Sequence, residues 1–352
     1  MKVFIWTSFV DLLYRKEGNI GGLAIQMKNW AEVFAQKGWK VFSLSLKEKR
    51  EYNNISFLRH YNVRFIGIFV EWFMAMYYTL TKRPDVIIMR AASRSTLPLA
   101  IFAKMVKAKL VFFGASDSDF IIGEELVNSK NDKIQHRKGL NRIKYVVAQN
   151  EKQKSLLEKN YGKKECIIIP NIWWADAVAE QEKDIDFLWV SNFRGLKRPE
   201  WFIKLAQEHP EYKFTMIGGP YEKDLYVNCE QAAKEIPNLD FLGKKSLDET
   251  NEYFKRARCF ICTSTMEGFP NTFLQAWSSN IPVLTTFSPS ELVEKHSLGT
   301  VVSEYDEMKE ELKKILEETS YKAKQEAIKN YFEKSHSPLS MYDKLMKMLN
   351  IK

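Results

Sequence analysis

One stretch of the chain, residues 264–277, combines a carboxylate, a glycine and amide side chains at a spacing suited to binding phosphates and hydroxyl groups. It runs from an apolar strand through a turn with Glu267 and Gly268 into a helix. Backbone N–H groups at such a helix start attract anions, and Glu267 can accept hydrogen bonds from hydroxyl groups. Gln275 follows Asn271 by four residues and so shares its helix face. The residues alone leave two interpretations open, a phosphate-and-hydroxyl site or an ordinary turn between strand and helix.

The cysteines indicate no second reactive site. Cys259 and Cys262 form a CxxC pair inside an apolar run that we interpret as a strand, where residues three apart face opposite sides. No second CxxC accompanies them, so we expect two core thiols and not a metal or redox pair. Four scattered cysteines make no disulfide framework, and a reducing cytoplasm is the expected compartment.

Two series of short apolar runs alternating with amphipathic runs must position these groups. We predict two doubly wound, Rossmann-like parallel sheets of an α/β fold, whose carboxyl ends face a central cleft. The expected domains are residues 1–170, residues 171–335 and a C-terminal helix at 336–352 that packs back on the first domain. The predicted strands are residues 3–6, 41–44, 86–89, 110–113, 145–148 and 166–169, then 187–190, 214–217, 239–242, 259–263, 283–284 and 300–302.

The longest apolar stretch, residues 65–80, is shorter than the roughly 20 residues of a membrane-spanning helix. As a helix it places six large apolar residues largely along one side: Phe65, Phe69, Trp72, Phe73, Met76 and Tyr77. That side suits either a domain core or a membrane interface. We favour the core, because an α/β domain needs helices that cover its sheet.

Charge divides the chain into a basic and an acidic half. Residues 1–170 contain 29 Lys and Arg against 15 Asp and Glu, a net charge of +14, whereas residues 171–352 contain 24 against 29, a net charge of −5. The 45% of hydrophobic residues exclude a disordered or fibrous protein. The basic half predicts an anionic partner, for which nucleic acid, a membrane surface and a phosphorylated acceptor are the candidates.

Several motifs, taken in order, resemble those of the retaining family-four glycosyltransferases of the GT-B fold, also called glycosyl transferases group one. The run Glu267-Gly268-Phe269-Pro270 before a helix is similar to the family's signature. Pro170-Asn171 resembles its interdomain pair, and residues 190–199 resemble its diphosphate-binding loop. The other similar segments are Gly21-Gly22, residues 83–87, Ile217-Gly218-Gly219-Pro220, Phe241-Leu242-Gly243 and residues 281–284.

The resemblance implies roles for matching positions. It implies that Lys197 contacts the donor diphosphate and that Glu267 binds sugar hydroxyls, while Arg194 and Lys197 stabilise negative charge on the departing phosphate. For Arg194 and Arg198, a solvated surface position is the alternative. Gly22 would let a loop approach the same phosphate, and Gly21 is assigned to the sugar side. The other implied donor-site residues are Asn192, Gly218, Gly243, Gly268, Phe269, Pro270, Asn271, Thr272 and Gln275.

Three positions depart from the family's pattern. Gln275 stands where the family has a second acidic residue, and its uncharged amide is a weaker acceptor for a ribose hydroxyl. Asn192 stands where the family often has an arginine, and we expect Arg194 to substitute for it. A segment that begins at Gly114 replaces the histidine that often follows the strand at 110–113.

That segment contains Asp117 and Asp119, which resemble the metal-binding Asp-x-Asp of the other large glycosyltransferase fold. GT-B enzymes generally hold no metal through this motif. We therefore interpret Asp117 and Asp119, together with Ser116, as groups that line the cleft and meet the acceptor or the donor sugar. No metal site is predicted.

The function implied is a retaining glycosyltransferase that moves a sugar from a UDP- or GDP-sugar to a glycan or lipid-linked acceptor, in bacterial cell-surface polysaccharide biosynthesis. Apart from this nucleotide-sugar substrate we expect no cofactor. The alternatives are a GT-B sugar-nucleotide epimerase and a non-catalytic sugar-nucleotide-binding protein, since Gln275 and Asn192 are compatible with lost activity. We expect no nucleic-acid partner, because the basic residues follow no recognition motif or aromatic stacking platform.

The same charges suggest where the protein works. We expect a cytoplasmic protein, peripheral at the inner face of the cytoplasmic membrane, with an anionic membrane surface as a partner. Attraction to an anionic leaflet contributes about 1 kcal/mol for each well-placed basic residue. The apolar stretch that begins at residue 3 ends at Asp11 without a small-residue cleavage site. We therefore interpret residues 3–6 as a buried strand and not as part of a signal peptide.

Overall fold

The computed structural model describes residues 1–15, 22–47, 49–52, 54–60, 67–127, 129–174, 182–265 and 269–351. The chain forms two compact units. Unit 1 comprises Met1–Ile172 together with Pro338–Lys352, and unit 2 comprises Trp173–Ser337. Each unit contains one sheet of mainly parallel strands, so the predicted pair of α/β sheets is confirmed.

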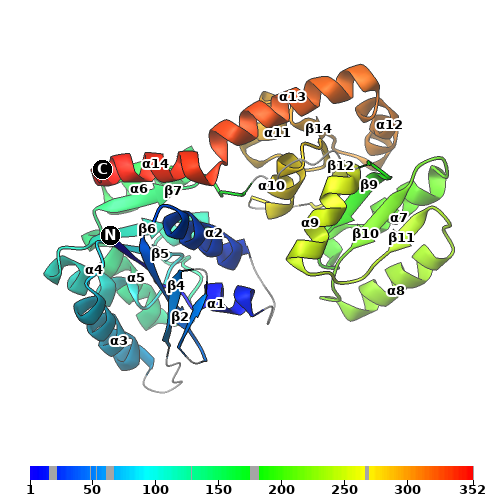
Figure 1. Ribbon diagram of the computed structural model, residues 1–352. Helices are drawn as coiled ribbons and strands as arrows, with labels where there is room; N and C mark the ends of the chain where they lie inside the picture. Colours follow the sequence, from blue (N-terminus) through cyan, green and yellow to red (C-terminus); the bar gives the residue numbers. More distant parts are fainter. Residues whose placement is uncertain are drawn as a thin grey trace. The chain divides into compact units, whose positions relative to one another are not determined.

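Unit 1 is built on an eight-stranded sheet in the order β3-β4-β2-β1-β5-β6-β7-β8 (Figure 1). Val3 of β1 pairs with Val41 on one side and Val86 on the other, both in parallel register. Among the described strands of this sheet, β3 alone runs antiparallel to its neighbour. The strands are β1 (Lys2–Ile5), β2 (Lys40–Ser45), β3 (Arg50–Tyr52), β4 (Ile55–Arg59), β5 (Val86–Arg90), β6 (Lys109–Phe113), β7 (Tyr145–Ala148) and β8 (Glu165–Ile168).

Helices cover both faces of this sheet. On one face, α3 to α6 pack on strand residues such as Phe4, Ile87 and Phe112. On the other face lie α2 and α14, where Trp39 Nε1 donates to Tyr342 Oη at 2.8 Å. The helices are α1 (Phe9–Tyr14), α2 (Gly22–Gln36), α3 (Gly67–Lys82), α4 (Thr96–Met105), η1 (Asp117–Phe120), α5 (Lys130–Arg142), α6 (Glu151–Tyr161) and α14 (Pro338–Leu349).

Helix α3 meets the sheet with the face opposite to the one we favoured. Met74, Ala75 and Tyr78 are buried against the sheet, whereas Phe69 and Phe73 are 75% and 60% exposed. The expectation that the phenylalanine side lies in the core is therefore wrong. Both faces carry large apolar residues, and the smaller Ala75 lets the helix approach the strands closely. Membership of α3 in the layer that covers the sheet was predicted correctly.

Unit 2 is built on a six-stranded parallel sheet in the order β11-β10-β9-β12-β13-β14 (Figure 1). Its strands are β9 (Ile185–Val190), β10 (Phe214–Ile217), β11 (Leu239–Phe241), β12 (Ala257–Cys262), β13 (Val283–Thr285) and β14 (Gly299–Val301). Its helices are η2 (Gly195–Lys197), α7 (Pro199–Glu208), α8 (Lys223–Lys234), α9 (Leu247–Arg256), α10 (Asn271–Ser278), η3 (Pro289–Glu291), α11 (Leu292–Lys295), α12 (Tyr305–Ile315) and α13 (Glu318–Ser335).

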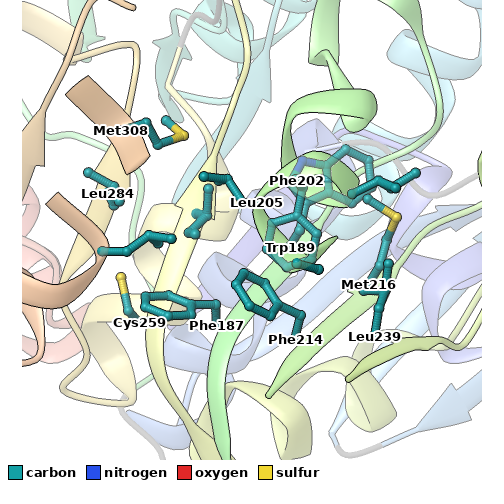
Figure 2. Packing of buried hydrophobic residues seen from close by; sticks show 14 of the residues in the cluster. Phe187, Trp189, Phe202, Leu205, Phe214, Met216, Leu239, Cys259, Leu284 and Met308 are labelled. Carbon is teal, nitrogen blue, oxygen red and sulfur yellow. The ribbon is translucent and has the colours of Figure 1, made fainter. Parts of the chain in front are cut away.

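Aromatic side chains fill the core between this sheet and helices α7, α8 and α12. Figure 2 shows Phe187, Trp189 and Phe214 of the strands beside Phe202 of α7. The Phe187 and Phe214 rings lie 5.1 Å apart between centroids, and Phe202 meets Phe214 edge-on at 5.3 Å. Packing of this kind fixes the strands relative to one another, so the loops at their carboxyl ends have defined starting points.

Local signals fix several helix starts. Ser246 and Glu249 form a capping box at α9, and Pro199 occupies the first turn of α7. Asn150 caps α6 by accepting from the Gln153 N–H. The reciprocal bond is displaced by one residue, because the Gln153 side chain accepts from the N–H of Gln149 at 2.9 Å.

The cysteines are thiols of the interior, as predicted for the CxxC pair. Cys259 and Cys262 are free and buried on β12, and Cys259 packs among the core residues in Figure 2. Burial raises the pKa of the Cys259 thiol, which keeps it protonated and unreactive. Among the described helices, none is both long and apolar enough to cross a membrane.

Candidate functional site

The carboxyl ends of β9, β10, β12 and β13 lie at one edge of the sheet in unit 2, because all four strands are parallel. In α/β sheets, ligands bind outside this edge. The segments that leave it include residues 191–198, which carry Arg194 and Lys197, and residues 263–270, which lead into α10. Two of the predicted motifs are therefore neighbours within one unit.

Backbone and hydroxyl hydrogen bonds join these two segments directly. The Thr265 N–H donates to the Leu196 carbonyl at 2.9 Å, and Thr263 Oγ1 donates to the Lys197 carbonyl at 2.5 Å. The turn itself is closed by the Lys197 N–H, which donates to the Arg194 carbonyl at 2.8 Å. The backbone of Lys197 is thus fixed beside the end of β12, with its side chain half-buried.

Arg198 ties the strand ends together. Its Nε donates to the Thr263 carbonyl at 2.7 Å, and its Nη2 donates to Thr286 Oγ1 at 2.8 Å. The guanidinium also lies 3.8 Å from the Trp201 ring centroid. Burial lowers the pKa of Arg198, although neighbouring acidic groups oppose the shift. Arg198 therefore connects three segments of unit 2 and is not a solvated surface cation.

Arg194 has a different environment. Its guanidinium carbon lies 3.6 Å from the centroid of the Tyr221 ring, which is itself 60% exposed. The Arg194 Nε is buried and has no hydrogen-bond partner among the described residues. Stacking orients the guanidinium while leaving donor capacity, and this arrangement suits an anion that approaches from solvent.

Two of the predicted glycines serve close approach of the backbone. A Cβ atom at Gly218 would lie 1.8 Å from the Ser191 carbonyl oxygen, a distance no side chain tolerates. The Gly218 N–H donates to the carbonyl of Gly243, whose φ of +64° favours glycine. Asn192 is exposed on the segment after β9, and its Oδ1 lies near Gly219.

Helix α10 follows β12 along the chain and packs against β12 and α9. Its N-cap residue Pro270 provides no side-chain cap, and its first turn contains no acidic residue. Asn271 and Thr272 in this turn are half-buried, as is Phe269 before it. Backbone N–H groups at such a start are suited to an anion. Glu267 and Gly268, the predicted sugar-binding carboxylate and its glycine, lie outside the described residues, as does Gly21 of unit 1.

Gln275 is turned toward the interior of unit 2. Its side chain is buried, and its Nε2 donates to Asn251 Oδ1 of α9 at 2.8 Å. The expectation that Gln275 lines an open site needs correction here, because its amide nitrogen already serves helix packing. A carboxylate at this position would face the Asn251 oxygen, which favours an amide.

Unit 1 presents its own carboxyl edge, where the segment after β6 carries the predicted acidic residues. Asp119 is buried and accepts from the backbone N–H groups of Ala92 at 2.9 Å, Ala115 at 2.7 Å and Ser116 at 3.0 Å. Both carboxylate oxygens therefore serve the fold, and the expectation that Asp119 meets a ligand is corrected. Sequence spacing did not reveal that η1 folds back on its own N-terminus.

The other members of this segment stay nearer to solvent. Asp117 accepts from Lys152 Nζ at 2.6 Å in an exposed ion pair, and Ser116 Oγ lies 2.6 Å from Ser118 Oγ. Asp117 and Asp119 thus have separate partners. Among the residues that the structure describes, no three His, Cys, Asp or Glu side chains gather as metal ligands. Gly22 is exposed at the first position of α2.

Arg90 was not predicted as a site residue. It ends β5 at the same edge and donates from Nη2 to Asn171 Oδ1 at 2.7 Å. Its Nε is buried without a hydrogen-bond partner in the described part of the chain. Burial lowers the pKa of Arg90 to about 10, although the charge of Asp119 acts in the opposite direction. An arginine directly after the apolar run 86–89 was the available signal in the sequence.

Comparisons with known proteins agree with this architecture. Residues 171–334 match the family described as Glycosyl transferases group 1. An uncharacterized glycosyltransferase of Methanocaldococcus jannaschii is 22% identical over 160 residues, or 40% of this chain and 39% of that protein. The Vi polysaccharide biosynthesis protein VipC/TviE of Salmonella typhi is 27% identical over 122 residues, or 33% of this chain and 20% of that protein. The matched regions thus span well under half of either relative.

A solved structure is similar over the whole length. The crystal structure of a glycosyltransferase from Rickettsia africae superposes with a TM-score of 0.72, covering 100% of this chain and 99% of that one at 13% identity. At this identity the likeness concerns the fold alone. It confirms the predicted fold class for both units.

Proposed function

The chain belongs to the glycosyl transferases group 1 family, and we propose that it transfers a sugar from a nucleotide-diphosphate-sugar to an acceptor with retention of configuration. One observation carries the proposal. Within the family-matched region, hydrogen bonds from Thr263 and Thr265 join the Lys197 turn to the segment that leads into α10. This arrangement brings a lysine, an arginine and an uncapped helix start to one sheet edge, which suits a diphosphate.

In the proposed reaction, the enzyme stabilises the negative charge that develops on the departing nucleoside diphosphate. Lys197 supplies a point charge to this group. Arg194, already oriented by Tyr221, donates hydrogen bonds to the same phosphates. N–H groups at the start of α10 add partial positive charge. We assign the binding of sugar hydroxyls to Glu267. The glycines 218 and 243 keep the backbone close enough for these contacts.

The test of this assignment is sugar transfer by Lys197→Ala and Glu267→Ala. Each variant should lose at least about 100-fold in kcat while remaining folded, because a preorganised charge contributes most in the transition state. Lys234→Ala is the matched control, since this exposed lysine ends α8 at the opposite edge of the sheet. Full activity in either site variant would refute the assignment.

The alternatives predict different products. A sugar-nucleotide epimerase converts the donor without any acceptor, whereas a transferase forms a new glycosidic product only when acceptor is present. A non-catalytic binding protein consumes no donor at a measurable rate. Product analysis of the intact protein with and without acceptor therefore separates all three.

We further propose a UDP- or GDP-sugar as donor and a glycan or lipid-linked sugar as acceptor, in polysaccharide biosynthesis at the cytoplasmic face of a membrane. The name of the Salmonella typhi relative supports the pathway, and the net charge of +14 in residues 1–170 supports an anionic acceptor or membrane. Thermal unfolding with a panel of nucleotide sugars tests the donor, because a ligand bound only by the folded state stabilises it.

A further inference from the structure

Helix α3 exposes a row of large apolar side chains. Phe69, Phe73 and Tyr77 follow one another at intervals of four residues and are 75%, 60% and 50% exposed, and Leu80 extends the row at 38%. The Phe73 and Tyr77 rings lie nearly parallel, with centroids 6.1 Å apart. We call these four residues the α3 stripe. A contiguous apolar surface of this kind marks an interaction site in a water-exposed protein.

The sequence around the stripe is strongly basic. Residues 67–110 contain seven Lys and Arg against two acidic residues, Glu71 and Asp85. Arg90 lies at the opposite, carboxyl edge of the sheet and Arg94 pairs with Asp132, so the cations that this segment contributes to the surface are Lys82, Arg83, Lys104 and Lys107. Glu71 accepts from Ser95 Oγ at 2.7 Å and lies 3.0 Å from His60 Nε2. Asp85 accepts from the N–H of Lys2 at 2.7 Å. Both carboxylates are therefore occupied within the unit, and the surface charge of this region is positive.

A depression of about 750 Å³ lies next to α4, where α4 and α5 end and β6 and β7 begin, and none of its lining residues belongs to α3. Its lining combines the buried apolar groups Ala103, Leu110 and Ile143 with exposed cations such as Lys104, Lys107, Arg142 and Lys144. In the described part of the chain, Lys104 and Lys107 make no ion pair. An apolar floor with a cationic rim suits a phosphate attached to a hydrocarbon chain.

The stripe and the depression belong to one surface. Helices α3 and α4 pack side by side, and the Trp72 and Phe102 rings meet edge-on at 6.1 Å. Each helix leads into the amino end of a parallel strand. Lys82 and Arg83 at the end of α3 therefore lie at the same amino edge of the sheet as Lys104 and Lys107 at the end of α4. Figure 1 shows both helices on one side of unit 1. The segment with Asp117 follows β6 at the opposite, carboxyl edge.

We propose that this α3–α4 surface docks the protein on an anionic lipid bilayer. The α3 stripe enters the interfacial region, and the basic residues at the ends of α3 and α4 contact lipid phosphates. Charge decides the occupant, because a two-fold symmetric dimer through this surface would bring the same basic residues opposite each other. The inference gives the proposed membrane contact a specific surface, and it does not depend on the identity of donor or acceptor.

The test is co-sedimentation of the full chain with vesicles of phosphatidylcholine alone and of phosphatidylcholine mixed with phosphatidylglycerol. The wild type should bind the anionic vesicles, and the binding should weaken as salt rises. Phe73→Ser/Tyr77→Ser should reduce the partition coefficient at least tenfold. Ile122→Ser/Leu126→Ser is the matched control, since these exposed apolar residues lie elsewhere in unit 1 at the same spacing.

The charge contribution has its own pair of variants. Lys104→Glu/Lys107→Glu should also reduce anionic-vesicle binding at least tenfold, whereas Lys159→Glu/Lys163→Glu changes the net charge equally on exposed positions around α6 and should retain most of it. All replaced side chains are exposed, so thermal unfolding should change little. Equal binding by both members of either pair would overturn the proposal.

Two further outcomes are informative. If the wild type ignores vesicles and forms dimers that Phe73→Ser/Tyr77→Ser abolishes, the surface is an interface between copies and the proposal is wrong. Donor binding, measured as the thermal stabilisation by a nucleotide sugar, should be the same in all these variants. If the wild type binds anionic vesicles but transfers no sugar, the proposed function is wrong and the docking proposal is unaffected.

Discussion

Replacing Arg198 tests how unit 2 holds its candidate site together. The guanidinium donates two hydrogen bonds, at 2.7 Å to the Thr263 carbonyl and at 2.8 Å to Thr286 Oγ1, and stacks on Trp201. Charged hydrogen bonds contribute about 1.5 to 3 kcal/mol each. Because the group is partly exposed, we take the lower limit for both bonds and add about 0.5 kcal/mol for stacking. Arg198→Ala should then lower the stability of unit 2 by about 3.5 kcal/mol.

The conservative variant sharpens this expectation. Arg198→Lys keeps the charge but has no planar fork, so it can satisfy one of the two acceptors and stack poorly. We expect it to recover about half of the loss, or about 1.8 kcal/mol. Because the Thr263 carbonyl and Thr286 Oγ1 lose a hydrogen-bond donor, the loss of stability should appear first at the ends of β12 and β13.

Hydrogen exchange of the full chain at increasing urea concentration provides the assay, since a protein of two units need not unfold in one step. Peptides from residues 185–205 and 257–265 report unit 2, and peptides from residues 86–113 serve as an internal reference. Arg258→Ala is the control, because the surface ion pair of Arg258 with Asp186 should contribute at most about 1 kcal/mol. The reasoning fails if Arg198→Ala destabilises unit 2 no more than Arg258→Ala does.

Three other predictions concern single residues and the donor. Gly218→Ala should lower the stability of unit 2 by about 1 to 3 kcal/mol, since its Cβ would meet the Ser191 carbonyl oxygen. An unchanged Tm would contradict this contact. Burial lowers the pKa of His136 in the folded state, so the unfolded chain binds the proton first and stability should fall as pH drops below about 6.5. His136→Gln should show a flatter dependence of Tm on pH, and parallel curves would argue against this source. Finally, Lys197→Ala should reduce the thermal shift caused by the preferred nucleotide sugar, whereas Lys234→Ala should not.

The sequence was most informative about the elements that are apolar throughout. Each predicted strand lies within a residue or two of an observed one, because a parallel strand covered on both faces leaves a continuous apolar run. Two strands were missed, the edge strand β3 and its neighbour β4. Arg50 and Glu51 of β3 show no such run, and Ser56 interrupts the apolar residues of β4. Capping patterns such as Ser246 with Glu249 were also local enough to predict.

The candidate site was harder to predict because its details depend on contacts distant in sequence. Arg194 and Arg198 are both arginines close together in sequence, yet Arg194 stacks on the exposed Tyr221 ring whereas Arg198 connects strand ends. Asp119 looked suited to a ligand until three backbone N–H groups converged on it. Similarly, helical periodicity placed Phe69 and Phe73 together but gave no means to decide which face of α3 meets the sheet.

The order of the units along the chain has a consequence for synthesis. Unit 2 is continuous, whereas unit 1 is completed only by α14, which is synthesised after the whole of unit 2. In unit 1 the Phe34 and Tyr342 rings meet edge-on at 5.3 Å, and Lys109 Nζ bonds to the Leu349 carbonyl. The first half of the chain must therefore wait with part of one face of its sheet uncovered until α14 has been made. A destabilising substitution in α14 would thus appear as a folding defect of unit 1.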